Sequence, residues 1–195
     1  WVLTKYKKLE PKDAEADFIL WLIQFEKQDY ETSNIYFNKA VLWGYKPKSV
    51  VERKLAYNYY ILWLYKNMFQ VLGYLVLEND ATEADITNAI YLALVYEESR
   101  YAGDWITLGK QKYTKSDSLL ALEAWYLRKI QKSGEAQVII DEILWRNNNL
   151  IALVQWWILA YESGYREKSK TLLTQAKILD TEGTWSETIE EYLGK

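Results

Sequence analysis

The chain has 195 residues, of which 50% are hydrophobic and 26% are charged, as in an ordinary soluble chain that can bury one continuous core. It contains only 8 Gly and 2 Pro, which disfavours sandwiches and barrels and favours long helices with short connections. The formal net charge of −3 provides no overall electrostatic footprint for nucleic acid, so we expect no nucleic-acid partner.

The chain has few residues suited to catalysis, because it contains neither His nor Cys. It therefore lacks an imidazole base, a thiolate nucleophile and the usual ligands of transition metals. Carboxylate pairs such as Glu97 with Glu98 are adjacent in the chain, and adjacent side chains on a helix diverge by about 100°. No glycine-rich phosphate loop is present. We predict a protein that is not an enzyme and that holds no cofactor or metal.

The first residues are basic, with Lys5, Lys7, Lys8 and Lys12, and we interpret these lysines as a solvated helix face. Residues 57–77, YNYYILWLYKNMFQVLGYLVL, are long enough to cross a bilayer. Lys66 near the centre would cost roughly 3 kcal/mol on insertion. We therefore predict no membrane insertion, and interpret this stretch as two buried helices joined at YKNM.

A self-similarity with a mean spacing of 34 residues runs along the chain. Ser169, Leu173 and Ala176 align with a triplet 136 residues earlier, which is four times 34. Each triplet is spaced i, i+4, i+7 and so lies on one face of a helix. The five triplets are Ser33, Phe37, Ala40; Met68, Leu72, Leu75; Tyr101, Trp105, Leu108; Ala136, Ile140, Ile143; and Ser169, Leu173, Ala176.

A second helical centre precedes each triplet by about twelve residues. These centres are Trp21, Ala56, Ala89, Ala124 and Trp157. Each unit is therefore predicted to be a helical hairpin with a short hinge, such as SGYR at residues 163–166. The predicted hairpins are residues 14–47, 48–81, 82–115, 116–148 and 149–181.

Polar residues stand where helices should begin. A capping box pairs a hydroxyl with a carboxylate three residues later. This spacing occurs at Ser49 with Glu52, Thr82 with Asp85, and Thr184 with Glu187. Ser116 and Asn148 or Asn149 can cap the fourth and fifth first helices. At the end of the chain, residues 184–194 are predicted to form a capping helix that covers the last apolar surface with Trp185, Ile189, Tyr192 and Leu193.

This pattern resembles the tetratricopeptide repeat family, whose unit is a 34-residue helix-turn-helix. The matching residues are Ser33-x3-Phe37 with Ala40, Ser169-x3-Leu173 with Ala176, Ala136-x3-Ile140, and Gly164 at the hinge. The resemblance covers residues 1 to 180. It implies an all-α fold, an α-solenoid of about five hairpins in a right-handed superhelix, in one domain of residues 1–195. Trp21 and Trp157 depart from the family's small residue, and most copies lack its closing proline.

The start of the chain also fits this pattern. Thirty-four residues before Ala40 lies Tyr6, and Pro11 stands where the family places its proline. The resemblance implies that residues 1–11 end the helix of a preceding repeat, so that either the molecule is a piece of a longer array or the first helix of that repeat has been lost upstream. An uncapped N-terminal end would then be a candidate contact for a homo-oligomer.

In this family the first helices line the concave face, and ligands usually lie there. The resemblance therefore implies a set of partner-binding residues on the first helices. They are Phe18, Phe25, Arg53, Tyr57, Tyr60, Ile90, Trp125, Arg128 and Tyr161. Arg53 and Arg128 are the only cations in this set, which disfavours a clamp for a peptide's terminal carboxylate. An aromatic groove suits amphipathic or aromatic-anchored peptides.

We predict a protein-interaction scaffold that binds a protein or peptide segment in this groove. Two alternatives stay open. One is a structural spacer or self-association segment of a longer repeat array, and the other is a carbohydrate-contacting module of a polysaccharide secretion system. The sequence leaves the compartment open, with the cytoplasm favoured over an extracytoplasmic location.

Overall fold

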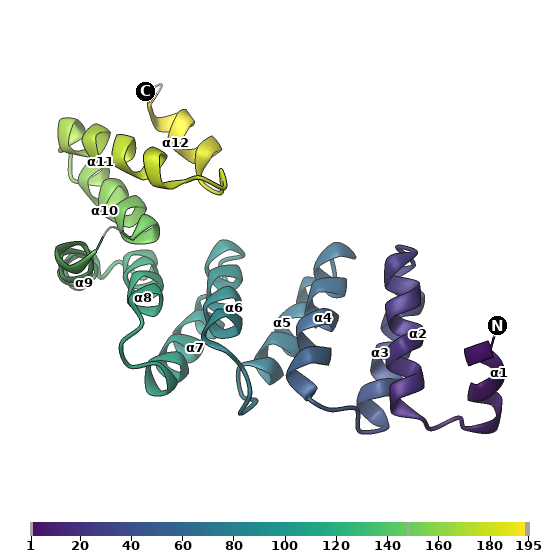
Figure 1. The fold of residues 1–195 in the computed structure, drawn as a ribbon. Helices are drawn as coiled ribbons and strands as arrows, with labels where there is room; N and C mark the ends of the chain where they lie inside the picture. The colour runs from purple at the N-terminus through teal and green to yellow at the C-terminus, as the bar shows by residue number, and fades with distance from the viewer. Residues whose placement is uncertain (1, 148, 194–195) are drawn as a thin grey trace. The chain divides into compact units, whose positions relative to one another are not determined.

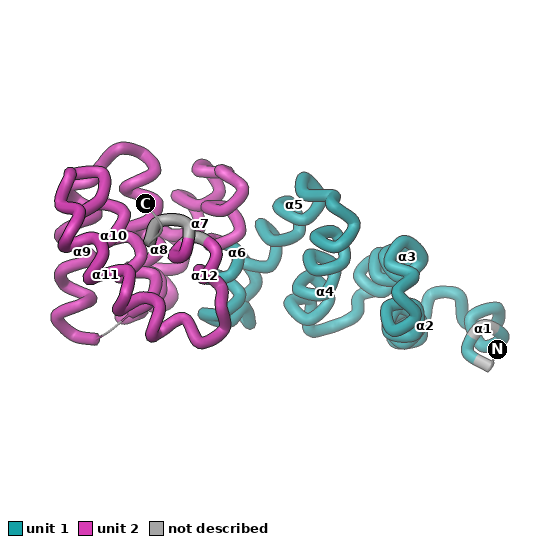
Figure 2. Tube along the Cα trace, turned by 90° about the horizontal axis from the view of Figure 1, so that it is seen from above, with its two compact units in different colours: residues 1–89 teal, residues 90–195 magenta. Residues whose placement is uncertain are grey.

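The computed structural model describes residues 2–147 and 149–193, and within these ranges it contains helices and no strand (Figure 1). The helices are α1 Val2–Leu9, α2 Ala14–Glu26, α3 Tyr30–Leu42, α4 Lys48–Ile61, α5 Tyr65–Leu75, α6 Glu83–Val95, α7 Ser99–Lys112, α8 Asp117–Lys129, α9 Ser133–Arg146, α10 Leu150–Glu162, α11 Arg166–Leu179 and α12 Ser186–Leu193. The all-α class is confirmed. The chain forms two compact units, residues 1–89 and 90–195 (Figure 2), and each is described by itself.

The helices from α2 to α11 follow one another as five hairpins, α2–α3, α4–α5, α6–α7, α8–α9 and α10–α11 (Figure 1). Three residues separate the two helices of every hairpin. The predicted architecture of helical hairpins is therefore confirmed, whereas the handedness of the superhelix stays a prediction.

The middle residue of each three-residue hinge has a left-handed backbone. These hinge residues, with their φ angles, are Gln28 (60°), Trp63 (59°), Glu97 (61°), Gln131 (64°) and Gly164 (82°). The N–H of the next residue donates to the carbonyl five positions earlier, at 2.8 to 3.0 Å in all five hinges. This is the Schellman motif, which satisfies carbonyls left free at a helix end. Only one of these five hinge residues is a glycine, Gly164, so glycine marks only one of the five hinges in the sequence.

Burial confirms four of the five predicted triplets, whose members are at most 5% exposed. The third triplet is wrong by one residue. Tyr101 is 38% exposed, and the buried face of α7 carries Ala102, Ile106 and Gly109. The last triplet members are then 40, 75, 109, 143 and 176, with spacings of 35, 34, 34 and 33. Trp105 and Ile106 are both apolar, so hydropathy alone does not choose between two faces that differ by about 100°.

The predicted junction at YKNM is displaced. Helix α4 ends at Ile61, the chain turns at residues 62–64, and α5 begins at Tyr65. The sequence offers no Gly or Asn there, because Trp63 itself adopts the left-handed conformation. In the described part of the chain, no helix has the length and apolar character needed to cross a bilayer.

Helix starts agree with the predicted caps in three cases. Thr82 and Asp85 form a reciprocal capping box, with N–H to side-chain distances of 2.9 and 3.2 Å. Ser116 accepts from the N–H of Leu119, and Asn149 accepts from the N–H of Ala152. Asn148, the alternative to Asn149, lies outside the described residues.

The predicted box of Ser49 and Glu52 is wrong. Ser49 is already the second residue of α4, and its hydroxyl donates instead to Asp80 at 2.6 Å. The predicted start at Thr184 is also displaced, since α12 begins at Ser186. Asp180 holds this start by accepting from the N–H of Trp185 at 2.8 Å.

The basic start of the chain is only partly a solvated face. The Lys7 side chain is 13% exposed, and its ammonium lies 2.8 Å from the carboxylate of Asp17, which is fully buried. The same ammonium donates to the carbonyls of Pro11 and Asp13 at 2.7 and 3.1 Å. Lys7 therefore joins α1 to α2. The prediction of a solvated face is wrong for Lys7, because the pattern of charges in the sequence does not reveal its ion pair with Asp17, ten residues later.

The C-terminal helix packs as a cap. Ile189 is fully buried in an apolar cluster with Leu172, Leu173 and Ala176 of α11, and Trp185 packs against the same cluster. The side chains of Tyr192 and Leu193 lie outside the described residues. Helix α12 thus covers apolar surface of the last hairpin, as predicted.

Gly164→Ala tests the hinge geometry. A Cβ at this position would meet nothing within 4 Å, so only the left-handed backbone opposes it. We expect a loss of about 1 kcal/mol in unfolding free energy, measured by urea denaturation. Gly134→Ala in α9 is the matched control, because Gly134 has the same open surroundings but no positive φ. It should keep or raise stability by up to about 1 kcal/mol, and an equal loss in both variants would contradict the assignment.

Candidate binding surface

The hinge residues place all first helices in one register. Seven positions before each hinge residue lies a buried centre: Trp21, Ala56, Ile90, Ala124 and Trp157. Six positions before it lies the neighbouring residue on the helix: Leu22, Tyr57, Tyr91, Trp125 and Ile158. In each unit, we call the residues of this second row and their helical neighbours the first-helix face of that unit.

This register corrects the assignment of Ile90. The side chain is fully buried, so Ile90 is a core residue that cannot contact a partner. Half-buried Tyr91 takes its place on the first-helix face. The prediction slipped because Ala89 looked like the small centre of α6, and Ala89 is buried as well. A step of 34 residues from Tyr57 reaches Tyr91 and then Trp125, so this spacing could have found Tyr91.

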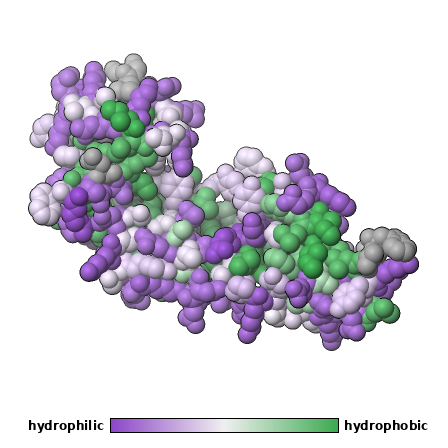
Figure 3. All heavy atoms as spheres, viewed as in Figure 1, coloured by the Kyte–Doolittle hydropathy of each residue, from purple (hydrophilic) through white to green (hydrophobic). Residues whose placement is uncertain are grey.

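In unit 1, α2 and α4 together present an aromatic surface. The rings of Phe25 and Tyr57 lie with their centroids 5.8 Å apart. Tyr57 and Tyr60 are 51% and 44% exposed, and Leu22 is 38% exposed on the same side of α2 as Phe25. We name Leu22, Phe25, Tyr57 and Tyr60 the Tyr57 surface. Apolar residues also gather over α2 in the space-filling view (Figure 3).

Phe18, predicted to bind a partner, makes aromatic contacts within unit 1. Its ring stacks on Tyr45 with centroids 4.1 Å apart and an interplanar angle of 12°. It also lies 5.2 Å from the ring of the buried Trp21. Burial raises the pKa of the Tyr45 hydroxyl. Phe18 therefore packs against Tyr45, in the link after α3, and against the buried Trp21.

Arg53 is engaged within unit 1. Its guanidinium makes two bonds to the carboxylate of Asp85, at 2.6 and 2.7 Å, from α4 to the start of α6. This bond raises the pKa of Arg53. Burial by itself would raise the pKa of Asp85, but the hydrogen bonds from Arg53 and Thr82 lower it below its ordinary value. The cation is thus neutralised in place, and does not form a free anion site.

In unit 2, Trp125 belongs to an aromatic cluster. Its side chain is only 6% exposed. The ring lies 5.7 Å from Tyr91 of α6 and 5.4 Å from Trp185, the residue just before α12. Trp185 also lies 6.5 Å from Tyr91, and all three pairs meet edge to face. The sequence assigned Trp185 only to a cap, because a contact across 60 residues leaves no trace in periodicity.

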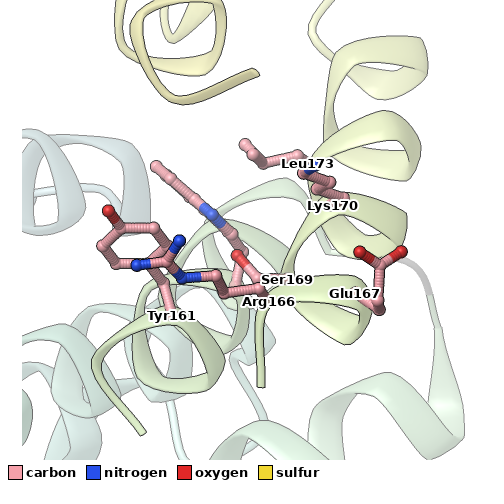
Figure 4. Close-up of a pocket in the computed structure, with 7 residues that line it drawn as sticks. Tyr161, Arg166, Glu167, Ser169, Lys170 and Leu173 are labelled. Atoms are coloured by element: carbon pink, nitrogen blue, oxygen red, sulfur yellow. The ribbon is translucent and has the colours of Figure 1, made fainter. Parts of the chain in front are cut away.

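Arg128 and Tyr161 both lie in unit 2, where Arg128 is hydrogen-bonded to α10. Arg128 of α8 donates to Gln155 at 2.9 Å and to Glu162 at 3.1 Å, both on α10. Tyr161 lines a pocket of about 260 Å³ between α10 and α11 (Figure 4). This volume is slightly below the roughly 300 to 1,000 Å³ that is usual for small-molecule sites. Among the residues that the structure describes, no three side chains form a group that could hold a metal ion.

Helix α4 carries a buried carboxylic acid, Glu52. Glu52 is 9% exposed, and within the described residues its Oε2 has no hydrogen-bond partner. Burial, with the neighbouring charges of Glu78 and Asp80, raises the pKa of Glu52 to about 7. Lys48 opposes this shift only in part.

Comparison with solved structures places this arrangement in a known fold. The structure of YrrB, described as a TPR protein with an unusual peptide-binding site, aligns over 98% of this chain and 98% of its own, with a TM-score of 0.65 and 11% identity. The chain has the tetratricopeptide repeat fold. The structure of Pseudomonas aeruginosa pilF aligns over 91% of this chain and 81% of its own, with a TM-score of 0.61 and 16% identity. No family model and no curated protein matches the sequence of this tetratricopeptide-fold chain.

Glu52→Gln tests the buried acid. The folded chain holds the Glu52 proton more tightly than the unfolded chain, so the stability contributed by this proton is complete below the unfolded pKa of 4.5. It is lost as the pH rises through the folded value of about 7. Glutamine cannot ionise, so at pH 8 the variant should exceed the wild type by about 1 to 3 kcal/mol in urea unfolding.

The gain should vanish near pH 4.5, where Glu52 is protonated in the folded chain. Glu26→Gln, at an exposed position of α2, is the control and should shift stability by no more than about 0.5 kcal/mol at either pH. A pH-independent gain in Glu52→Gln would refute the assignment of the raised pKa.

Proposed function

We propose that the chain is a non-catalytic interaction scaffold that binds a segment of a protein partner on its first-helix face. The observation that carries this proposal is the exposure of Tyr57 and Tyr60, 51% and 44%, beside Phe25. Tyrosine rings offer a large, rigid contact area with a hydroxyl that can hydrogen-bond to a partner, at low entropy cost. Exposed apolar surface of this kind marks interaction sites more often than random surface does.

The charges around this surface favour an aromatic-anchored or amphipathic segment as the partner. Arg53 is neutralised by Asp85, and Arg128 of unit 2 donates to Gln155 and Glu162. An acidic or terminal carboxylate that bound Arg53 or Arg128 would compete with these internal acceptors. An apolar or aromatic side chain can contact Leu22 and Tyr57 without such a cost.

The alternative of a pure spacer is weakened by the same exposed rings, since a spacer has no need of them. A carbohydrate-contacting role could also use exposed aromatic rings, but no observation singles out a sugar-sized site on the Tyr57 surface. YrrB is described as having a peptide-binding site, which supports the view that this fold accommodates peptides. We extend that use to the present chain as part of the proposal.

Tyr57→Ala and Tyr60→Ala test the proposal directly. Twelve-residue peptides selected from a random phage-displayed library on the wild-type chain should bind each variant about tenfold or more weakly, measured by fluorescence anisotropy, because each substitution removes one aromatic contact. Tyr74→Ala is the matched control, since Tyr74 is 53% exposed but lies on the second helix α5. Circular dichroism should show equal helicity in all variants.

Two outcomes would count against the proposal. In one, the wild-type chain enriches no peptide. In the other, the enriched peptides bind Tyr57→Ala and Tyr74→Ala with equal affinity, which would place their site away from the first-helix face.

A further inference from the structure

The first-helix face of unit 2 differs from the Tyr57 surface in being already occupied. Trp185 precedes α12 in the chain, yet its ring contacts Tyr91 of α6 and Trp125 of α8. It also packs against the apolar cluster of the last hairpin and α12, which includes Trp157, Leu173 and Ile189. The indole of Trp185 thus contacts the first helices α6 and α8 as well as the apolar cluster of the last hairpin.

The geometry around Trp185 is that of a fitted site. Its ring meets Trp125 at 61° and Tyr91 at 89°, in the edge-to-face arrangements that aromatic pairs prefer. Tyr91 and Trp125 occupy the same row of the first-helix face as Tyr57. Trp125 is 6% exposed in the presence of this indole.

The segment that carries Trp185 is lightly held. Residues 181–184 are exposed, and α12 has eight residues, below the roughly 12 to 15 at which isolated helices become even marginally stable. Among the described side chains, Ile189 and Trp185 bury its apolar surface, and Asp180 accepts from the N–H of Trp185 and the hydroxyl of Ser186 at 2.8 and 3.3 Å. Displacing Trp185 moves only this short, tethered element, and it uncovers the part of the last hairpin against which Ile189 packs.

We propose that the surface of Tyr91 and Trp125 is a tryptophan-binding site, occupied in the free chain by Trp185, and that a tryptophan-bearing segment of a protein partner binds there by displacing Trp185. The occupant follows from the indole that already fills the site. The segment from residue 181 to residue 185 acts as an internal competitor, whose effective concentration is set by its short tether. This inference deepens the proposed function, since it rests on the first-helix face as the binding surface.

The test uses the full chain and a labelled synthetic peptide with the sequence of residues 181–193, TEGTWSETIEEYL. Trp185→Ala empties the site and leaves Tyr91 and Trp125 in place. Fluorescence anisotropy should show this variant binding the peptide about tenfold or more tightly than the wild type, because the internal competitor is gone. The same peptide with alanine at the tryptophan position should bind neither chain.

A second variant, Asp180→Ala, keeps the proposal testable if Trp185→Ala does not fold. Asp180→Ala keeps all three rings but removes the acceptor that holds the N–H of Trp185. It should also bind the peptide more tightly than the wild type, by several-fold. Tyr91→Ala combined with Trp185→Ala should lose the binding again. Thr181→Ala, at an exposed position beside Asp180, is the control and should behave as the wild type.

The proposal is overturned if neither Trp185→Ala nor Asp180→Ala binds the peptide more tightly than the wild type, since Trp185 would then be only a core residue. It is also overturned if Asp180→Ala forms dimers in light scattering without binding the peptide, since copies of the chain would then exchange their own segments. The test does not use the Tyr57 surface. The two proposals can therefore fail separately. If Tyr57→Ala binds the phage-selected peptides as well as the wild type does, while Trp185→Ala gains affinity for the synthetic peptide, only the proposal for the Tyr57 surface fails.

Discussion

The left-handed hinge is the constraint on which the rest of the structure depends. A chain that leaves one helix must reverse within three residues, and a positive φ at the middle residue does this while satisfying the free carbonyls of the first helix. Four of the five hinges accept the conformation without glycine, at a cost that packing must offset. Hairpins therefore form because burial of the apolar faces on either side of the hinge offsets the strain of the left-handed residue.

The hinge also fixes which residues face inward. The buried triplet of the second helix starts five residues after each hinge residue, as at Gln28 and Ser33 or Gly164 and Ser169. The buried centre of the first helix lies seven residues before it. One backbone position thus sets the rotation of two helices, and with it the row of residues that borders the buried centres. This is why one slip of register placed both Tyr101 and Ile90 on the wrong faces.

Polar contacts between successive hairpins hold neighbouring helices together. Asn58 is fully buried, and its amide donates to Ser33 and Asn34 at 2.9 Å each. Arg53 and Arg128 serve the same end through Asp85 and Glu162, so the two cations of the predicted site hold helices together. The proposed binding residues that remain are aromatic, with Tyr57 exposed in one unit and Trp125 buried in the other.

The sequence by itself determined the helical hairpins, their mean period and most of the packing triplets. An i, i+4, i+7 pattern of apolar residues is a local property that survives in any context. It also determined the aromatic character of the first-helix row, including Tyr57 and Trp125. Only the tertiary structure decided the left-handed conformation of residues such as Trp63, the burial of Lys7 against Asp17 and the return of Trp185 to Tyr91. Each depends on a backbone rotation or a through-space partner, and neither is encoded in the spacing of hydrophobic residues.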